Sequence, residues 1–211
     1  MNNALLVTGG LAPPVSMLQK ELQSASCVCA ADSGFDTCLS WNLIPDIALG
    51  DMDSVEHSKE LSQCREVLRF PRDKDYTDTE LGINLLRERG FDTITVAGGG
   101  GGRADHIFAL LYLFFRTQAP EQWITDKERI LHLPRAMRFS VPLGACVSVF
   151  PGPYGSTGMS SKGLRWPLDG LVWKNSDFGI SNVAVSEEIM IDPGKYPLIA
   201  VLPLETVIMR A

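Results

Sequence analysis

The chain changes character near residue 120, and this change constrains the fold more than any other feature of the sequence. Before it, short apolar runs alternate with helix-like segments: Cys27–Ala31 precedes Asp36–Trp41, and Thr93–Ala97 precedes Arg103–Arg116. Such alternation is typical of a mostly parallel sheet with helices on its faces. We therefore expect residues 1–120 to form an α/β domain with a mostly parallel, Rossmann-like sheet.

Residues 121–211 contain only short apolar runs, many of them separated by proline or glycine. Val147–Phe150 and Leu198–Leu202 are two of these runs, and no convincing helical period of apolar residues accompanies them. Closely spaced short strands with turn residues between them are typical of antiparallel sandwiches and barrels. The expected second domain, residues 121–211, is therefore all-β and sandwich-like.

Composition narrows the possible partners and the cellular location. The 211 residues carry a formal net charge of −6, which disfavours an unspecific nucleic-acid surface. No apolar run approaches the roughly 20 residues that span a bilayer, and no basic segment precedes the first apolar stretch. The five cysteines form no C-x-x-C pair. We therefore expect a cytoplasmic protein in a reducing setting that binds neither nucleic acid nor membrane.

Aspartates are concentrated after the predicted strands of the first domain. The chain has fourteen aspartates, and ten of them lie between residues 32 and 105. Asp32 directly follows Cys27–Ala31, and Asp51 and Asp53 follow the short run Ile47–Leu49. Ligands of parallel sheets bind at the carboxyl ends of the strands, so these acids are expected to converge there.

The pair Asp51 and Asp53 permits two interpretations. On an extended segment, side chains two residues apart point the same way, and their repulsion is costly unless a cation lies between them. Oxygen ligands of this kind suit Mg²⁺. Because Asp and Gly also form solvated turns, the pair alone favours neither interpretation.

The segment Arg72–Asp75 alternates basic and acidic side chains. Cations beside metal-binding acids fit a site for Mg²⁺ and a triphosphate, where Lys or Arg neutralises charge. Thr77 and Glu80 have the spacing of a capping box, and Asp78 in the first turn would favour the helix dipole. Part of this segment therefore simply begins a helix.

A run of glycines, Gly98–Gly102, precedes a third polar cluster. Such a turn before a helix exposes N–H groups to an anion, although a flexible loop is the alternative. Arg103 would bind phosphate, Asp105 would bind metal or substrate, and His106 is more simply a packed or capping residue. No nucleophile–base pair stands out, so the residues alone indicate Mg²⁺-dependent chemistry on a nucleotide phosphate.

Several of these motifs occur in an order that resembles the thiamine pyrophosphokinase (thiamine diphosphokinase) family. One departure is Ser33, where the family usually has glycine, and the glycine run is longer than in the family. The motifs that carry the resemblance are Ala31–Gly34, Ile44–Asp46 with Gly50–Ser54, Asp75–Asp78, Gly102–His106, Ser161–Leu168 and Ser181–Asn182.

The resemblance implies an ATP-dependent diphosphotransferase that uses Mg²⁺. The hydroxyl of thiamine would attack the β-phosphorus of ATP, giving thiamine diphosphate and AMP. The resemblance also implies a homodimer in which the second domain helps to build a thiamine pocket at the subunit interface. Two other functions stay open: an Mg²⁺-dependent nucleotide phosphohydrolase, and a non-catalytic module that senses thiamine or nucleotide.

Three sets of candidate site residues follow from the motifs and the resemblance. In the first set Asp51, Asp53 and Asp78 would hold the metal. Asp32 and Asp105 could bind nucleotide or metal, or accept the hydroxyl proton. In the third set Trp166 would stack on the cationic, aromatic thiamine, with an ordinary buried tryptophan as the alternative. The catalytic set is Asp51, Asp53, Asp75, Asp78, Arg103 and Asp105; the set for ATP and phosphate is Asp32, Ser33, Lys74, Thr77, Gly102, Arg103 and His106; the set for thiamine is Trp166, Ser181 and Asn182.

Overall fold

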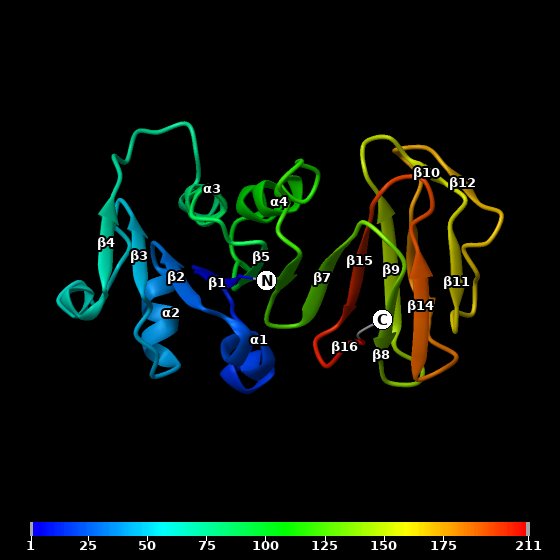
Figure 1. Ribbon diagram of the computed structural model, residues 1–211, viewed down its shortest axis with the longest axis horizontal. Coiled ribbons are helices and arrows are strands. Elements are labelled where there is room, and N and C mark those ends of the chain that lie inside the picture. The colour runs from blue at the N-terminus through cyan, green and yellow to red at the C-terminus, as the bar shows by residue number, and fades with distance from the viewer. Residues whose placement is uncertain (1, 210–211) are drawn as a thin grey trace. The chain divides into compact units, whose positions relative to one another are not determined.

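The computed structural model describes residues 2–209, and the chain divides into two compact units, Met1–Asp126 and Lys127–Ala211. The division falls a few residues after the expected one, beyond strand β6 (Gln122–Ile124). The first unit alternates strands and helices and the second is built from strands, as the change in sequence character predicts (Figure 1).

The first unit contains a six-stranded parallel sheet in the order β6-β5-β1-β2-β3-β4. Figure 1 shows α3 and α4 on one face of this sheet and α1 and α2 on the other. Its elements are β1 (Asn3–Thr8), η1 (Val15–Leu18), α1 (Gln19–Ser24), β2 (Cys27–Ala31), α2 (Gly34–Ser40), β3 (Ile47–Gly50), η2 (Glu60–Gln63), β4 (Glu66–Arg69), α3 (Asp78–Glu88), β5 (Thr93–Ala97), α4 (Ala104–Leu113) and β6.

The central strands are buried along nearly their whole length because helices cover both faces of the sheet. Leu5, Leu6 and Val7 are consecutive in β1, and none of them is exposed. Continuous rather than alternating burial distinguishes a parallel sheet of this kind from an antiparallel sheet with one wet face. The expected α/β class is therefore confirmed. The segment after Pro14 begins as the 3₁₀ turn η1 and becomes α-helical only at Gln19.

The second unit consists of antiparallel sheets, and residues 127–209 contain no helix. One sheet has the order β13-β9-β15-β7, the other has the order β11-β14-β8-β16, and β10 pairs with β12. The strands are β7 (Glu128–Leu133), β8 (Met137–Ser140), β9 (Cys146–Pro151), β10 (Ser156–Thr157), β11 (Ser160–Lys162), β12 (Val172–Trp173), β13 (Gly179–Val183), β14 (Glu188–Asp192), β15 (Leu198–Pro203) and β16 (Val207–Met209).

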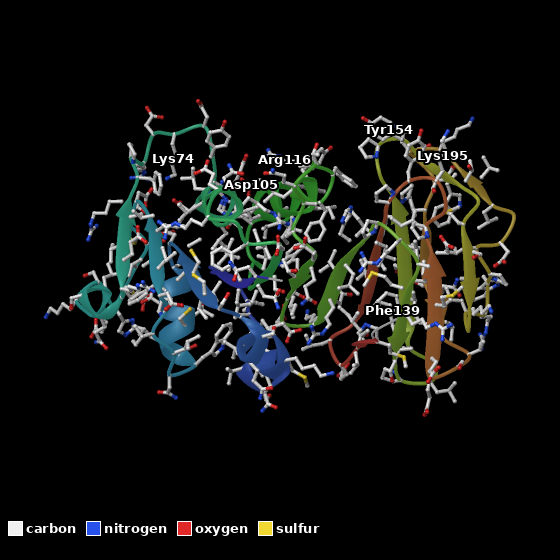
Figure 2. The ribbon with its side chains drawn as sticks, in the orientation of Figure 1. Lys74, Asp105, Arg116, Phe139, Tyr154 and Lys195 are labelled. Carbon is white, nitrogen blue, oxygen red and sulfur yellow. The ribbon has the colours of Figure 1, made fainter. Side chains whose placement is uncertain are left out.

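Both sheets of the second unit supply side chains to one apolar core. Leu131, Val147 and Leu198 come from the first sheet, whereas Phe139 and Ile189 come from the second. Phe139 is fully buried and is labelled in Figure 2. Two sheets that share a core in this way form the sandwich-like arrangement that the sequence predicts.

None of the helices among residues 2–209 is long and apolar enough to cross a membrane.

Candidate functional site

A cleft of about 600 Å³ opens at the carboxyl ends of the parallel strands in the first unit. This volume lies within the range of small-molecule sites. Lys74, before α3, belongs to the lining and is labelled in Figure 2. The lining consists of Thr8, Gly9, Gly10, Ala31, Asp32, Ser33, Asp51, Asp53, Ser54, Arg72, Lys74, Tyr76, Thr77, Asp78, Thr79, Gly99, Gly101, Gly102, Arg103, His106, Ala109 and Leu110.

Three carboxylates of this cleft form a group that we call the acid cluster: Asp32, Asp51 and Asp53. Each offers one oxygen, and these oxygens lie within 4.8 Å of one another. Asp32 follows β2, and the other two acids follow the neighbouring strand β3. Strand ends that are adjacent in the sheet therefore bring together acids that are about twenty residues apart in the sequence.

Asp51 and Asp53 meet through a turn rather than through strand alternation, which corrects the extended geometry assumed above. Met52 has a φ of 63°, in the left-handed region, and the Asp53 N–H donates to Asp51 Oδ1 at 3.0 Å. A local Asp turn of this kind is one of the two interpretations that the sequence left open. Because the turn also brings both carboxylates to Asp32, the two interpretations are compatible.

Gly50 allows the chain segments around the acids to approach closely. Its φ is 141°, and a Cβ at this position would lie 3.2 Å from Asp78 Oδ1 and 3.3 Å from the Cα of Asp32. A larger residue would therefore be strained and would push the ends of β2 and α3 away from β3. The glycine before the two acids is part of how the cluster is assembled.

Two carboxylate oxygens in the cleft are buried and accept no hydrogen bond from any described residue: Asp32 Oδ1 and Asp78 Oδ1. The other oxygen of Asp32 accepts from the Ser54 hydroxyl, and the Lys74 ammonium lies 3.3 Å from Asp78 Oδ1 and 3.6 Å from Asp51 Oδ2. Burying a charged oxygen without a partner is costly. Oxygen-only donors with spare lone pairs are the ligands that Mg²⁺ prefers, so the residues fit this ion.

The neighbouring carboxylates of Asp51 and Asp53 have pKa values that are shifted in opposite directions. The interaction with Asp51 raises the pKa of Asp53, whereas the backbone N–H of Asp53 lowers that of Asp51. Burial raises the pKa of Asp78, although the neighbouring Lys74 opposes this shift. Carboxylates that perturb one another in a cleft are a common feature of functional sites.

The geometry selects a slightly different set of acids from the predicted metal ligands. The prediction names Asp51, Asp53 and Asp78, but the acid cluster contains Asp32 in place of Asp78. Asp78 instead faces Lys74. The identity of the ligands stays a prediction, with Asp32 now a stronger candidate than its motif alone indicated.

Helix α3 begins where the capping motif predicts, and this places Asp78 at the cleft. Thr77 Oγ1 accepts from the Glu80 N–H at 3.2 Å. The reciprocal half of the capping box is not made, because the Glu80 carboxylate pairs with Arg116, labelled in Figure 2. One side-chain cap is therefore enough to start the helix with Asp78 in its first turn.

The glycine run is held firmly, which reduces the number of N–H groups it can offer to an anion. The N–H groups of residues 98, 99 and 100 donate to the carbonyls of Ile124, Gly9 and Leu11, at 3.0, 2.8 and 2.9 Å. Four of the five glycines have positive φ values, which other residues rarely adopt. Contacts to phosphate therefore fall to the last two glycines and to the start of α4.

Arg103 is the N-cap residue of α4 and lies beside Asp105, which is labelled in Figure 2. Its Nε and Nη2 donate to the two oxygens of Asp105 at 3.1 and 2.5 Å, and both side chains are mostly exposed. Arg103 and His106 line the cleft, whereas Asp105 and Asp75 do not. The structure therefore separates these two acids from the rest of the predicted catalytic set.

The predicted thiamine residues lie in the second unit, and Trp166 is exposed rather than buried in its core. Its exposed fraction is 56%, and the Arg165 guanidinium lies 5.6 Å from the centre of its ring. The segment that carries Trp166 is closed by the Leu168 N–H, which donates to the Ser161 hydroxyl at 2.9 Å. An exposed indole on a closed segment is available for stacking.

Asn182 is nearly buried and clamps the backbone of Trp166. Its Oδ1 accepts from the N–H groups of Trp166 and Val183 at 3.1 and 2.8 Å, and its Nδ2 donates to the Trp166 carbonyl at 2.6 Å. One N–H of the side-chain amide takes part in none of these hydrogen bonds and could donate to a ligand. Ser181, with a φ of 57°, donates its N–H to Ser148 Oγ at 3.1 Å.

Several lining residues were not singled out as site residues by sequence reasoning. Thr8 and Thr79 join their hydroxyls at 2.6 Å in the cleft wall, and Arg72 Nε lies 3.5 Å from Asp53 Oδ2. The pair Gly9–Gly10 at the end of β1 was the available signal for that edge. No sequence pattern connects Thr8 to Thr79.

The sequence of this chain is similar to those of known proteins. Residues 18–125 match the family model described as "Thiamin pyrophosphokinase, catalytic domain". The curated thiamine pyrophosphokinase of Bacillus subtilis (strain 168) is 32% identical over 88 residues, which is 40% of this chain and 41% of the relative's own length.

Solved structures share the fold over nearly the whole chain. A thiamine pyrophosphokinase from Bacillus subtilis has a TM-score of 0.80 at 22% identity, covering 96% of this chain and 99% of that one. A thiamin pyrophosphokinase from Candida albicans has a TM-score of 0.71 at 16% identity, covering 96% of this chain and 88% of that one. At these identities the similarity shows the fold alone.

Proposed function

This chain belongs to the thiamin pyrophosphokinase family, and on that premise we propose that it transfers the diphosphate of ATP to the hydroxyl of thiamine with the help of Mg²⁺. The products would be thiamine diphosphate and AMP. The observation that carries the proposal is the acid cluster, which shares one cleft with Lys74 and Arg103. Carboxylates for a cation and cations for phosphates are the two halves of a site for a metal-bound triphosphate.

The residues that would hold Mg²⁺ are the three acids of the cluster, with Asp78 beside them. The bound ion would supply charge neutralisation for the triphosphate. The buried free oxygen of Asp32 supports this assignment, because it accepts no hydrogen bond from the described chain. The Ser54 hydroxyl, bonded to the other oxygen, would orient this carboxylate.

The cationic side chains of the cleft would bind the phosphates. Lys74 now lies between Asp51 and Asp78, so it is held where a phosphate bound near these acids would meet it. Arg103 would offer its planar fork to phosphate oxygens, and Asp105 would orient that fork. Placing ATP and alcohol in line is the main task of such a site.

The proposed reaction forms one bond to phosphorus and breaks one. The thiamine oxygen forms a bond to the β-phosphorus, and the bond from that phosphorus to the oxygen shared with the α-phosphate breaks. AMP leaves with that oxygen. The hydroxyl proton passes to a carboxylate of the cleft.

We place thiamine on Trp166, whose exposed ring suits a cationic aromatic ligand. A homodimer with the thiamine pocket at the subunit interface belongs to the same proposal. Phe108 and Tyr112, one turn apart on α4, are 61% and 66% exposed, and a second copy is one partner that would cover them. The cytoplasmic location expected from the cysteines stays a prediction.

Phosphorus NMR of the protein with ATP, Mg²⁺ and thiamine tests the proposal. The expected spectrum shows AMP and thiamine diphosphate appearing together, with neither forming when thiamine or protein is omitted. ADP as the product would show that one phosphate moves, not two. AMP and diphosphate formed without thiamine would show a hydrolase, and binding of thiamine without turnover would show a sensing module.

A further inference from the structure

The loop that carries two acids of the cluster has no helix or strand of its own. We call residues 51–57 the acid loop; they follow β3, and the chain forms only turns until η2 begins at Glu60. A segment of this kind keeps its shape through side-chain bonds to its surroundings. The position of Asp51 and Asp53 therefore depends on what holds the loop.

The acid loop is fastened to the start of α2 at its far end. Asp36, in the first turn of α2, accepts the N–H groups of Glu56 and His57, each at 3.0 Å. The ring atom His57 Nδ1 lies 2.7 Å from Asp36 Oδ1. One carboxylate thus binds two successive backbone groups and the side chain of the same loop.

The near end of the loop is fastened to the same segment. The Ser54 hydroxyl donates to Asp32, which lies one helical turn before Asp36 in the sequence. The short segment from Asp32 to Asp36 therefore contains two groups that matter for the cluster. Asp32 is one of its acids, and Asp36 holds the loop that carries Asp51 and Asp53. A change at Asp36 would alter the spacing within the cluster without touching any of its members.

We propose that Asp36 and His57 are positioning residues, which hold the acid loop so that Asp51 and Asp53 face Asp32 and which thereby set the affinity of the cluster for a divalent cation. The link to catalysis rests on the proposed function, but the effect on cation binding does not. Outer partners of this kind commonly change metal affinity 10- to 100-fold when they are removed.

The charges around His57 favour its protonated form. The hydrogen bond to Asp36 raises the pKa of His57 above its usual 6.5, and Glu60 and Glu56 add to this effect. Burial alone would raise the pKa of Asp36, but the bonds from His57 and from the two backbone N–H groups lower it. The charged pair is therefore complete below pH 6.5 and is lost as the pH rises through the raised pKa of the imidazole.

The test is direct measurement of Mn²⁺ binding by electron paramagnetic resonance, without substrates, at pH 6 and at pH 8.5. Asp36→Ala is expected to weaken binding about tenfold. His57→Gln is expected to weaken it about threefold at pH 6, the value of one ordinary hydrogen bond, with a smaller effect at pH 8.5. Glu60→Gln is the matched control, because it removes a charge facing His57 without removing an acceptor of the loop, and it should bind Mn²⁺ as the wild type does.

The proposal is overturned if folded Asp36→Ala and His57→Gln bind Mn²⁺ with wild-type affinity at both pH values, even if their Tm is lower. An effect of His57→Gln that is equal at pH 6 and pH 8.5 would refute the role of the charged pair. Should Asp36→Ala fail to fold, Asp36→Asn and the exposed His57 carry the test. Normal Mn²⁺ binding by a wild type that forms no thiamine diphosphate would refute the proposed function and leave this inference standing.

Discussion

The candidate polar residues of the two units differ in how completely their hydrogen bonds are satisfied. In the first unit, Asp32 keeps a buried oxygen without a hydrogen-bond partner among the described residues, and a buried oxygen of Asp78 has only the Lys74 ammonium beside it, at 3.3 Å. In the second unit, Asn182 bonds three backbone groups and keeps one N–H free for anything else. Buried groups left without partners indicate a missing ligand, whereas satisfied ones indicate a scaffold. The acids are therefore expected to bind, and Asn182 to position Trp166.

The largest effect should come from neutralising an acid of the cluster. Asp51→Asn and Asp53→Asn are each expected to lower kcat by at least about 100-fold, because the charge that binds the cation and its phosphates is lost. The Tm of Asp53→Asn should not fall, because Asp51 raises the pKa of Asp53 and the change removes this repulsion. The Tm of Asp51→Asn should fall slightly, because the lowered pKa of Asp51 means that the fold stabilises its charge. Steady-state kinetics and thermal unfolding measure the two quantities.

Asp73→Asn is the matched control for these variants, because Asp73 is an exposed acid of the charged segment Arg72–Asp75 and does not line the cleft. It should retain nearly wild-type kcat. Near-normal activity of Asp51→Asn or Asp53→Asn would contradict a role of the acid cluster in binding the cation.

Trp166→Ala should have the next largest effect, and on one substrate only. Loss of the stacking surface is expected to raise the KM for thiamine about tenfold and to leave the KM for ATP unchanged. Because the side chain is 56% exposed, the free energy of unfolding should change little. Equal effects on the two KM values would contradict a thiamine platform in the second unit.

Asn182→Ala should act through Trp166 and therefore more weakly on thiamine. The truncation removes the side-chain partner of part-buried backbone groups of Trp166 and Val183, so we expect a loss of about 1 kcal/mol in the free energy of unfolding. The KM for thiamine should rise only a few-fold. Urea unfolding together with kinetics measures both, and Ser181→Ala is the neighbouring control, since Ser181 bonds through its backbone N–H. A tenfold rise in KM with unchanged stability would instead make Asn182 a direct ligand.

Asp105→Asn should have the smallest effect. Its carboxylate is 61% exposed, lies outside the cleft lining and is already paired with Arg103. Exposed ion pairs contribute little, so kcat is expected to fall less than about threefold. A loss as large as that of Asp51→Asn would show that this acid has a catalytic role that its position does not indicate.

The architecture and most of the cleft could be predicted because they depend on local patterns. Continuous apolar runs identify β1 and β2, since strands covered on both faces need no alternation. Thr77 correctly predicts the start of α3. The acids could be located because parallel strands place their carboxyl ends at one edge. The usual glycine at position 33 is not required here, because Ser33 has an ordinary helical φ of −60°.

What the sequence could not predict depends on contacts between distant residues. The left-handed Met52 turns Asp51 toward Asp53, although the pattern alone is equally compatible with a strand. Asp36 binds the acid loop some twenty residues ahead of it, and no motif relates the two segments. Glu80 pairs with Arg116 rather than completing its capping box, because tertiary contacts override a local preference.

The central claim is that the acid cluster is incomplete without a divalent cation and the triphosphate it carries. Competition between Mg²⁺ and Mn²⁺, followed by electron paramagnetic resonance in the presence of a non-hydrolysable ATP analogue, tests it most directly. The account predicts that the wild type binds Mn²⁺, that Mg²⁺ displaces it, and that the double variant Asp51→Asn, Asp53→Asn loses this binding while remaining folded. Equal Mn²⁺ binding by the wild type and the folded double variant would contradict it.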